Sequence, residues 1–456
     1  MDLLTLAIGG LAAICAWLWA VRDPMRTIVP AYAALIPLGG VLALRIPLPP
    51  PFNTLSSAAG ALAIVALAVH LLRSGRGRVP SLPVGAWLLF VAWGAITVLW
   101  SVDPTDVVRE MTLAVPLLAI MVLVAMEPAD EGDLRRVAWA TLASSAAIGA
   151  YGIALIVVGG SLPEHGLSAR FSLGANPADT NPNQLAASLL LPFFLGLGLT
   201  LDRHDPGAQR WRAYAAPGGT ILTGVAIVLS GSRGGALATA VGSAVFVALA
   251  WRWSPWRRGA VRRLVAAGIA GAAALVLAGV LATSLAPDGR IASLLAGDAV
   301  SRLGAVESSS GRAEIWTAGA LACTAYCGVG SGLGTFPGVY NDVFAFSNVT
   351  RNVGASRPGH NLYLEIAVET GLLGIVLFWM AIGSEFRAIA RRRASWLAPA
   401  LAAAIVAILV ADIFEGFLWF KHAWLPFTVI RVFESAADRS ASADTRREAA
   451  FPQVSS

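Results

Sequence analysis

The sequence predicts an all-α polytopic membrane protein, a bundle of about 12–13 transmembrane helices with one long outer loop. Of the 456 residues, 57% are hydrophobic and only 13% are charged, about half the charged fraction of a soluble domain. Apolar runs of roughly 17–25 residues recur from end to end, and each is long enough to cross a bilayer. Arginines gather in the short segments between these runs, as topology signals do.

The individual spans follow from these apolar runs. In chain order we expect them at Leu3–Val21, Thr27–Ala43, Ser56–Leu72, Val84–Trp100, Val108–Met126, Val137–Val158, Gln184–Leu201, Thr220–Leu229, Gly235–Trp251, Leu264–Ala286, Leu362–Phe378, Trp396–Phe420 and Trp424–Phe433. The first run has no basic segment before it and no small-residue cleavage site, so we expect a retained helix rather than a signal peptide. One misread span near the N-terminus would reduce the number to twelve.

The loops between the spans alternate in charge. Arginine-rich loops lie at Arg22/Arg26, Arg73/Arg76/Arg78, Arg135/Arg136, Arg203/Arg210/Arg212, Arg252–Arg263, Arg387–Arg393 and from Arg431 onward. By the positive-inside rule these loops face the cytoplasm. The opposite loops, at Pro47–Asn53, Ser101–Asp106, Gly159–Asn183, Ser230–Gly234, Pro287–Asn361 and Lys421–Ala423, then face outward.

Four units follow from this topology. Residues 1–286 form an N-terminal transmembrane bundle, and residues 287–361 form a long outer loop. Residues 362–433 hold the C-terminal spans, and residues 434–456 read as a disordered cytoplasmic tail because they are rich in Ala, Ser, Asp and Arg. A loop as long as 287–361 is usually functional.

Charge and cysteine content exclude two other classes. The net charge of +6 comes from arginines placed as topology signals, so we expect no nucleic-acid partner. Cys323 and Cys327 are four residues apart on a predicted helix, which we interpret as poor disulfide geometry. No His or Cys cluster lies near them, and we expect no metal site.

The segment SGSRGG, at Ser230–Gly235, interrupts an apolar stretch and opens the next helix. Its glycines leave backbone N–H groups free at a helix N-terminus, and Arg233 adds a planar donor fork suited to phosphate. A short turn with a snorkelling arginine is the alternative. An arginine on the outer side runs against the positive-inside rule, which favours a functional role.

The segment SGRAEIW, at Ser310–Trp316, begins a predicted helix at Arg312–Tyr326 inside the long loop. Arg312 would lie in the first turn beside free N–H donors, where it suits the other oxygens of a pyrophosphate. A surface arginine paired with Glu314 explains the pattern equally well. The nearby glycine-rich segment Gly328–Gly334 lacks a strand–turn–helix context, so we interpret it as a packing turn rather than a dinucleotide site.

The segment PGHNLYLEIAVETGLLG, at Pro358–Gly374, places His360 where an aqueous loop meets a membrane span. The helix dipole disfavours an imidazolium there, so His360 is expected to be neutral and able to accept a proton. Asn361, Glu365 and Glu369 follow at four-residue spacing, and carboxylates in a span usually face the bundle interior. Alternatively, His360 caps the helix and the glutamates pair with arginines elsewhere.

Other polar residues could support these segments. Asp412 and Glu415 add acid in a late span, and either could orient His360, neutralise an arginine or bind a cation. Arg170 and the segment Asn181–Gln184 lie in another outer loop and could bind sugar hydroxyls. The asparagines fit turn and cap positions better.

Together these motifs resemble the O-antigen ligase/polymerase superfamily. The features are SGSRGG opening a helix, SGRAEIW in a long outer loop, GVGSGLGTF, and HNLYLEIAVETGLLG, with WSVDP at 100–104 and NPNQLAA at 181–187 in the same pattern. The resemblance extends over residues 93–424, and it depends on the order and spacing of the motifs rather than on any one of them.

The resemblance implies a metal-independent, inverting glycosyltransferase with a GT-C-like membrane fold. Its place would be the inner membrane of a Gram-negative bacterium, with the active site at the periplasmic face. The donor would be a glycan on undecaprenyl pyrophosphate and the acceptor lipid A–core, among membrane lipids and with no cofactor. By position, the essential arginines fall on Arg233 and Arg312, the essential histidine on His360, and a late acidic position on Asp412.

Several functions remain open at this stage. From the residues themselves, Arg170, Asn361 and Glu365 are possible supporting positions. Within the superfamily, ligases, polymerases and protein-transferring enzymes share these motifs. The single long late loop and the short C-terminal tail favour a ligase. A polyprenyl-glycan transporter without bond chemistry is the alternative of another class.

Overall fold

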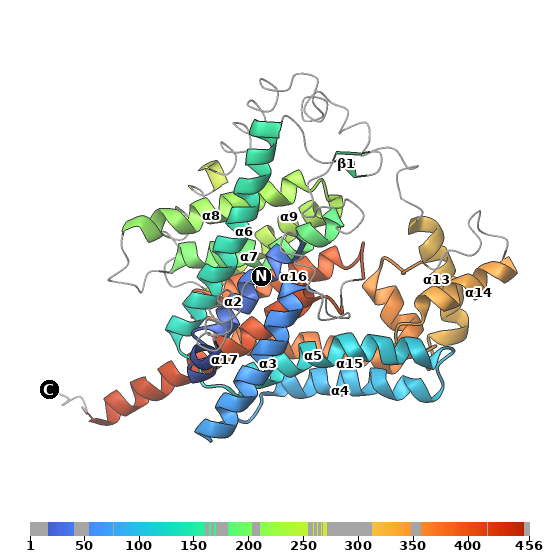
Figure 1. The fold of residues 1–456 in the computed structure, drawn as a ribbon, viewed down its shortest axis with the longest axis horizontal. Helices are drawn as coiled ribbons and strands as arrows, with labels where there is room; N and C mark the ends of the chain where they lie inside the picture. Colours follow the sequence, from blue (N-terminus) through green and yellow to red (C-terminus); the bar gives the residue numbers. More distant parts are fainter. Residues whose placement is uncertain are drawn as a thin grey trace, which may run out of the picture.

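A computed structural model describes most of the chain as a helical bundle (Figure 1). The described residues are 17–40, 54–159 without 76, 164–165, 168–169, 181–202, 210–253, a few positions between 259 and 270, 312–347, and 357–450 without 417. The helices are α2 (Ile28–Leu35), α3 (Leu55–Ser74), α4 (Leu82–Ile96), α5 (Pro104–Met126), α6 (Glu131–Gly159), α7 (Pro182–Leu201), α8 (Arg210–Leu229), α9 (Arg233–Trp253), α13 (Arg312–Tyr326), α14 (Phe336–Ser347), α15 (Leu362–Arg391), α16 (Ala398–Ala411) and α17 (Lys421–Ala450). Two short 3₁₀ turns, η1 (Pro37–Gly40) and η2 (Thr97–Leu99), and a hairpin of two-residue strands, β1 (Glu164–His165) and β2 (Ser168–Ala169), complete the described elements.

The predicted all-α membrane bundle is confirmed. Seven helices in the described part of the chain are long and apolar enough to cross a membrane: α3, α4 with η2, α5, α6, α7, α9 and α15. Of the other predicted spans, Leu3–Val21 and Leu264–Ala286 lie largely outside the described residues. The apolar helices at Tyr214–Leu229 and Ala398–Ala411 are shorter.

Two terminal predictions differ from the structure. The predicted span Trp396–Phe420 is helical only over α16, because the chain turns at Asp412 and runs as a loop to Phe420. The predicted disordered tail is helical up to Ala450, since α17 runs without a break to this residue and projects from the bundle (Figure 1). The polarity of this segment predicted disorder, but the segment continues a helix whose first part is packed in the bundle.

The helices alternate in direction, which gives the bundle two distinct ends. One end, here named the site end, is where α3, α5, α7, α9 and α15 begin. Their first residues are preceded by capping side chains: Thr54, Asp103, Asn181, Ser232 and Asn361 each accept a hydrogen bond from a backbone N–H of the first turn. Each such cap contributes about 1 kcal/mol and fixes where its helix starts.

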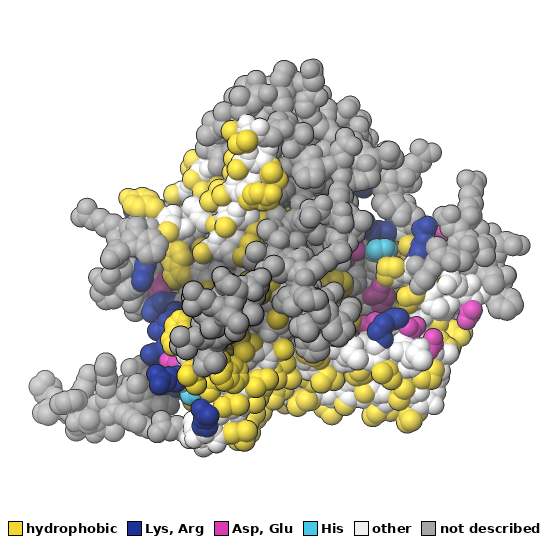
Figure 2. Space-filling view, in the orientation of Figure 1, with side chains coloured by type: hydrophobic (Ala, Val, Ile, Leu, Met, Phe, Trp, Pro, Cys, Tyr) yellow, Lys and Arg dark blue, Asp and Glu magenta, His cyan; other side chains and the backbone are white. Residues whose placement is uncertain are grey.

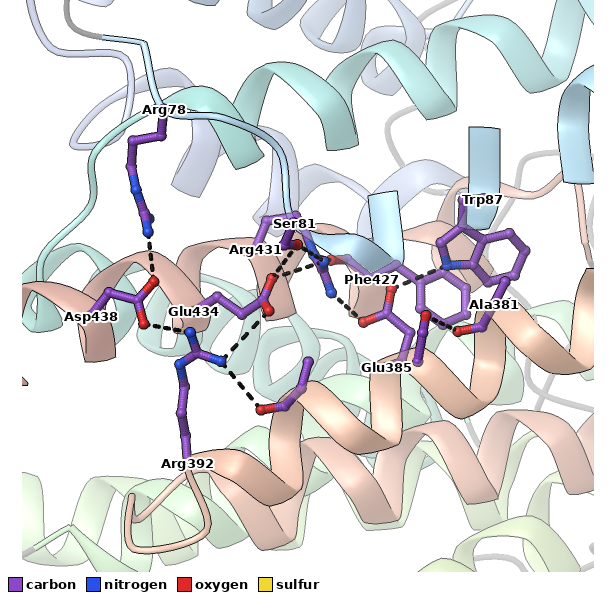
Figure 3. A network of polar contacts seen from close by, with 12 residues as sticks. Arg78, Ser81, Trp87, Ala381, Glu385, Arg392, Phe427, Arg431, Glu434 and Asp438 are labelled. Carbon is purple, nitrogen blue, oxygen red and sulfur yellow. Dashed lines mark hydrogen bonds and ion pairs between the residues drawn. The ribbon is translucent and has the colours of Figure 1, made fainter. Parts of the chain in front are cut away.

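The opposite end, here named the arginine end, holds much of the basic charge. Arg78, Arg392 and Arg431 meet Glu385, Glu434 and Asp438 there in one polar network (Figure 3). Arg431 and Glu385 are completely buried and pair directly. This network joins α17 to α15 and to the start of α4, where Ser81 accepts from Arg431 at 2.7 Å. It thereby fixes the register of α17 against its neighbours.

Glycines let the central helices approach closely. Helix α7 is the most buried of the candidate spans. A Cβ at Gly198 would lie 2.9 Å from Leu397, and one at Gly242 would lie 2.4 Å from Phe194. Small residues at such crossings allow backbone contact between membrane helices.

Helix α15 is kinked at Gly371, where φ is +68°. The kink removes the helical partners of nearby carbonyls, and the glycine-rich turn supplies new ones: Ser331 N–H donates to Val368 O and Gly332 N–H to Glu369 O, both at 2.9 Å. A Cβ at Gly330 would lie 2.4 Å from Glu369 O, so only glycine fits. The predicted packing role of this turn is confirmed, and the turn positions the acidic face of α15.

Helices α13 and α14 lie together beside the start of α15 (Figure 1). They enclose a small core of their own with α15, which includes Ile315, Phe336, Tyr340 and Val368. The predicted helix Arg312–Tyr326 matches α13. The expectation that Cys323 and Cys327 stay unpaired was wrong: the structure joins them in a disulfide, because their Cα atoms at the end of α13 lie only 4.5 Å apart.

Candidate functional site

Three helix starts meet at the site end around the loop that joins α16 to α17. Arg233 is the first residue of α9, Arg312 is the first residue of α13, and His360 stands two positions before α15. In the space-filling view, basic, acidic and histidine side chains lie together at this end of the bundle (Figure 2). The sequence predicted these three residues as one site, and the structure gives their relative placement.

Glu415, in the α16–α17 loop, is the shared partner of two of them. Its Oε2 lies 2.9 Å from Nδ1 of His360, and its Oε1 accepts from Arg312 Nη2 at 2.7 Å. Asn183 Nδ2, from the first turn of α7, also donates to Oε1 at 2.7 Å. One carboxylate therefore fixes side chains from α7, α13 and the start of α15.

Electrostatics keep this carboxylate ionised. The side chain of Glu415 is only 8% exposed. Burial by itself raises the pKa of the carboxyl, but the hydrogen bonds from His360 and Asn183 and the positive charge of Arg312 outweigh burial, so the pKa of Glu415 lies below its usual range. Glu415 therefore carries a negative charge at neutral pH.

His360 has an unusual backbone. Its φ is +47°, and it is the one non-glycine residue with positive φ in the described part of the chain. Such a conformation costs a non-glycine residue about 1–3 kcal/mol and is found most often at functional sites. Trp316 Nε1 on α13 donates to the His360 carbonyl at 3.4 Å, and Asn361 caps α15 through Leu364 N–H at 3.1 Å. These contacts hold the strained residue in place.

The imidazole has one nitrogen committed and one available. Nδ1 faces the Glu415 carboxylate, an acceptor, so the geometry assigns the proton to Nδ1 and leaves Nε2 as the acceptor nitrogen. The side chain is 31% exposed, so a substrate can reach it. A base that another group orients in this way is the usual arrangement for proton transfer.

Arg312 is also only partly satisfied. Its side chain is 23% exposed and binds Glu415 through Nη2. Its Nε is buried and has no hydrogen-bond partner among the described residues. The remaining N–H groups of the guanidinium are therefore positioned to bind an anion.

Arg233 lies at the edge of the same loop. The turn before it has Gly231 at φ +61°, and Ser232 caps α9 through Gly235 N–H at 3.1 Å. A Cβ at Gly234 would lie 3.3 Å from Phe414, the residue before Glu415. The start of α9 thus contacts the loop that carries Glu415, and Arg233 itself is exposed.

The predicted supporting residues have different places. Asp412 ends α16, and its carbonyl accepts from Leu362 N–H at 2.9 Å, so its backbone ties α16 to the start of α15. The carboxylate that contacts His360 and Arg312 belongs to Glu415, three residues later, the other acid that the sequence offered for orienting His360. Arg170 lies outside the described residues.

A cavity of about 600 Å³ lies beside this cluster. Its wall includes Gly416, next to Glu415, and the predicted supporting residue Glu365 on the first turn of α15. The backbone of Gly416 packs closely against Glu365, since a Cβ at this position would come within 2.0 Å of Glu365 Oε2. The volume falls within the range of small-molecule sites.

Sequence reasoning missed several residues of this region. For Asn183 a turn or cap role was favoured over binding of sugar hydroxyls; Asn181 does provide the cap, and Asn183 binds Glu415. Trp316 was part of a noted motif without a role of its own. Arg109 and Glu110 line the cavity from α5 but follow an ordinary amphipathic pattern, which gave no signal. Lys421 did have a visible signal in the sequence. It is the only lysine of the chain, and it stands between two aromatic residues and a histidine.

Comparison with known proteins gives a family match for part of the chain. Residues 218–379 match the family described as O-antigen ligase. The matched segment contains the three helix starts with Arg233, Arg312 and His360, while Glu415 lies beyond it. A search of curated proteins finds no match.

Proposed function

Because residues 218–379 match the O-antigen ligase family, we propose that the chain transfers a glycan from undecaprenyl pyrophosphate to a sugar hydroxyl of lipid A–core. The reaction takes place at the periplasmic face of a Gram-negative inner membrane, with the arginine end in the cytoplasm. The observation that carries the proposal is the shared carboxylate: Glu415 holds His360 and Arg312 at the edge of one cavity.

His360 is the general base. Glu415 accepts a hydrogen bond from the Nδ1–H group, which keeps its proton. Nε2 takes the proton of the acceptor hydroxyl. The hydroxyl oxygen attacks the anomeric carbon from the face opposite the diphosphate, the bond from that carbon to the diphosphate oxygen breaks, and the configuration inverts. The products are the glycosylated acceptor, undecaprenyl diphosphate and a protonated His360.

The arginines stabilise the leaving group. Negative charge grows on the diphosphate as its bond to the sugar breaks, and fixed donors that face this charge lower the barrier. Arg312 contributes the guanidinium N–H groups that Glu415 does not use, and Arg233 adds a second guanidinium at the start of α9. The transfer is metal-independent because these cations replace a metal ion.

A gel assay of transfer tests this proposal. Purified protein in lipid nanodiscs is incubated with a glycan on undecaprenyl pyrophosphate and with lipopolysaccharide that lacks the glycan, without nucleotide and with EDTA. We expect a ladder of modified lipopolysaccharide. A longer lipid-linked glycan with unmodified lipopolysaccharide would identify a polymerase instead, and no new bond in either substrate would indicate a transporter.

A further inference from the structure

The cavity beside the cluster contains two groups of charged side chains. Glu110 of α5 and Glu365 and Glu369 of α15 line it, and the Glu369 carboxylate accepts from Phe336 N–H at 3.2 Å. Lys421, the first residue of α17, lines it as well. Glu365 and Glu369 lie on the helix that His360 precedes, and Pro358, two residues before His360, also lines the cavity.

Lys421 is held by neutral groups. Its Nζ donates to Ser57 Oγ at 2.6 Å, Ser56 Oγ at 2.9 Å and Thr54 Oγ1 at 3.3 Å, all at the start of α3. None of the carboxylates that the structure describes lies within ion-pair distance of it. Hydroxyl groups satisfy its hydrogen bonds but leave its positive charge uncompensated.

Burial of the ammonium group confirms this isolation. Burial alone lowers the pKa of Lys421 to about 8, so the cavity carboxylates do not offset the cost of its charge. A charged, partly desolvated lysine is stabilised by an anion that enters its site. At neutral pH Lys421 therefore favours a negatively charged group in the cavity.

The other lining groups suit a sugar. Carboxylate and amide oxygens accept hydrogen bonds from hydroxyls, and the cavity offers Glu365, Glu369 and Gln184. Trp419 and Phe420 give it apolar surface next to Lys421. These groups match a ligand that has several hydroxyls and one anionic substituent.

We propose that this cavity binds a sugar unit of the acceptor that carries an anionic substituent, a phosphate or a carboxylate, and that Lys421 recognises the substituent. The proposal rests on the proposed function, because the acceptor hydroxyl must reach Nε2 of His360. It names the chemical class of sugar that the site selects. The anion site at Lys421 is separate from the diphosphate site of Arg233 and Arg312, which do not line the cavity among the described residues.

Binding of small sugars tests the proposal without any transfer. The full chain in nanodiscs is titrated by ligand-observed NMR with glucose 6-phosphate, glucuronate and glucose as probes. We expect the anionic probes to bind about 10-fold more tightly than glucose at pH 7, the gain typical of a charge-assisted hydrogen bond. The two anionic probes distinguish a phosphate from a carboxylate as the preferred substituent. Equal affinities for all three probes would overturn the proposal.

Variants test whether Lys421 causes the preference for anionic probes over glucose. Lys421→Gln should abolish this preference, whereas Lys421→Arg should keep it. Arg73→Gln, at the far end of α3, is the matched control that also removes one positive charge. If Lys421→Gln does not fold, the role of Lys421 can still be tested with Lys421→Arg, by comparing how its preference for anionic probes depends on pH with that of the unmodified protein. A preference that survives Lys421→Gln but is lost in Arg312→Gln would place the anion at the diphosphate site and refute the assignment.

The pH dependence separates a lysine from an arginine. Lys421 loses its charge as pH rises through about 8, so the preference of the unmodified protein should fall several-fold between pH 7 and pH 9. Lys421→Arg should retain it, since a guanidinium stays charged. The other charged or titratable lining groups are common to both proteins: Arg109, Glu110, Glu365, Glu369 and His422. The same pH response in both would refute the role of Lys421.

A transfer assay then connects the site to the reaction. Lys421→Gln should raise KM for the acceptor about 10-fold and leave KM for the donor unchanged. A change in donor KM alone would contradict the acceptor assignment. If the unmodified protein shows no preference for the anionic probes, this inference is refuted even where transfer is observed. If the unmodified protein shows the preference but no transfer, the proposed function is refuted instead.

Discussion

Two charged clusters stand at opposite ends of the bundle. They differ in how completely the charged side chains are buried and paired with hydrogen-bond partners. At the arginine end, Arg431 is completely buried and bonds to Ser81, Glu385, Glu434 and the Phe427 carbonyl (Figure 3). At the site end, Arg312 and His360 share one carboxylate and remain partly exposed beside a cavity. Both clusters contain arginines paired with glutamates, so the presence of such pairs does not separate them.

The difference separates a structural role from a functional one. A buried, saturated network leaves no donor for a ligand, and removal of one member leaves an uncompensated charge. An open cluster keeps donors and a lone pair free, and it includes a residue in a strained backbone conformation, His360. We therefore expect substitutions at the two ends to change different measured quantities.

The largest effect is expected at the proposed base. His360→Ala should lower the transfer rate by about 10²–10⁴-fold, because no other group at Nε2 takes the acceptor proton. Its midpoint of thermal unfolding should change little, since alanine removes only one contact of Glu415. His70→Ala, near the arginine end, is the matched histidine control and should keep the rate. Full activity of His360→Ala in the gel assay would remove this residue from the mechanism.

A substitution at the arginine end should instead affect stability. Arg431→Met leaves Glu385 buried without its charged partner and should lower the free energy of unfolding by about 3–5 kcal/mol. The specific activity of the folded fraction should remain. The double variant Arg431→Met with Glu385→Leu should recover part of the loss, because both charges are then gone. A stable Arg431→Met protein with low activity would reverse the roles of the two clusters.

A smaller effect is expected at the carboxylate that connects the site. Glu415→Gln should lower the turnover number by about 10–100-fold, since a charged hydrogen-bond partner of His360 and Arg312 becomes neutral. Glu415→Asp should restore part of the rate. Asp412→Asn is the matched control, and its rate should be close to that of the unmodified protein. Comparable losses of turnover in Glu415→Gln and Asp412→Asn would indicate that Asp412 also takes part in the site.

The smallest effect is a pH dependence of stability. The pKa of Glu415 is lowered from an ordinary value of 4.5, so its ionised form stabilises the fold above about pH 4.5, and this contribution is lost as pH falls through the lowered value. The midpoints of thermal unfolding of the unmodified protein and Glu415→Gln, measured between pH 7 and pH 2, should therefore differ most above about pH 4.5 and converge at the acidic end. A constant difference across this range would indicate that the charge of Glu415 adds no stability.

The local parts of the site were well predicted from the sequence. The start of α13 at Arg312, the start of α15 at Leu362 and the packing role of the glycine-rich turn all agree with the structure. These features depend on neighbouring residues, through capping chemistry and glycine backbone freedom. The length of α17 was wrong because the helix extends beyond its apolar part.

The partners of these residues could not be predicted. Glu415 lies 55 positions after His360 and 103 after Arg312, and Asp412 was an equally acidic candidate. Which of the two acids faces the histidine depends on where α16 ends and how the following loop packs against α7, α13 and α15. A pairing over such distances leaves no periodicity in the sequence.

The sequence by itself determined that the chain crosses a membrane many times and which charged residues stand at helix starts, because hydrophobic burial and helix capping act locally along the chain. Only the tertiary structure decided that Glu415 connects Arg312 to His360, that the network around Arg431 is closed, and that Lys421 lies in a cavity with three glutamates. Such contacts arise from the packing of distant helices, whose geometry no single segment encodes.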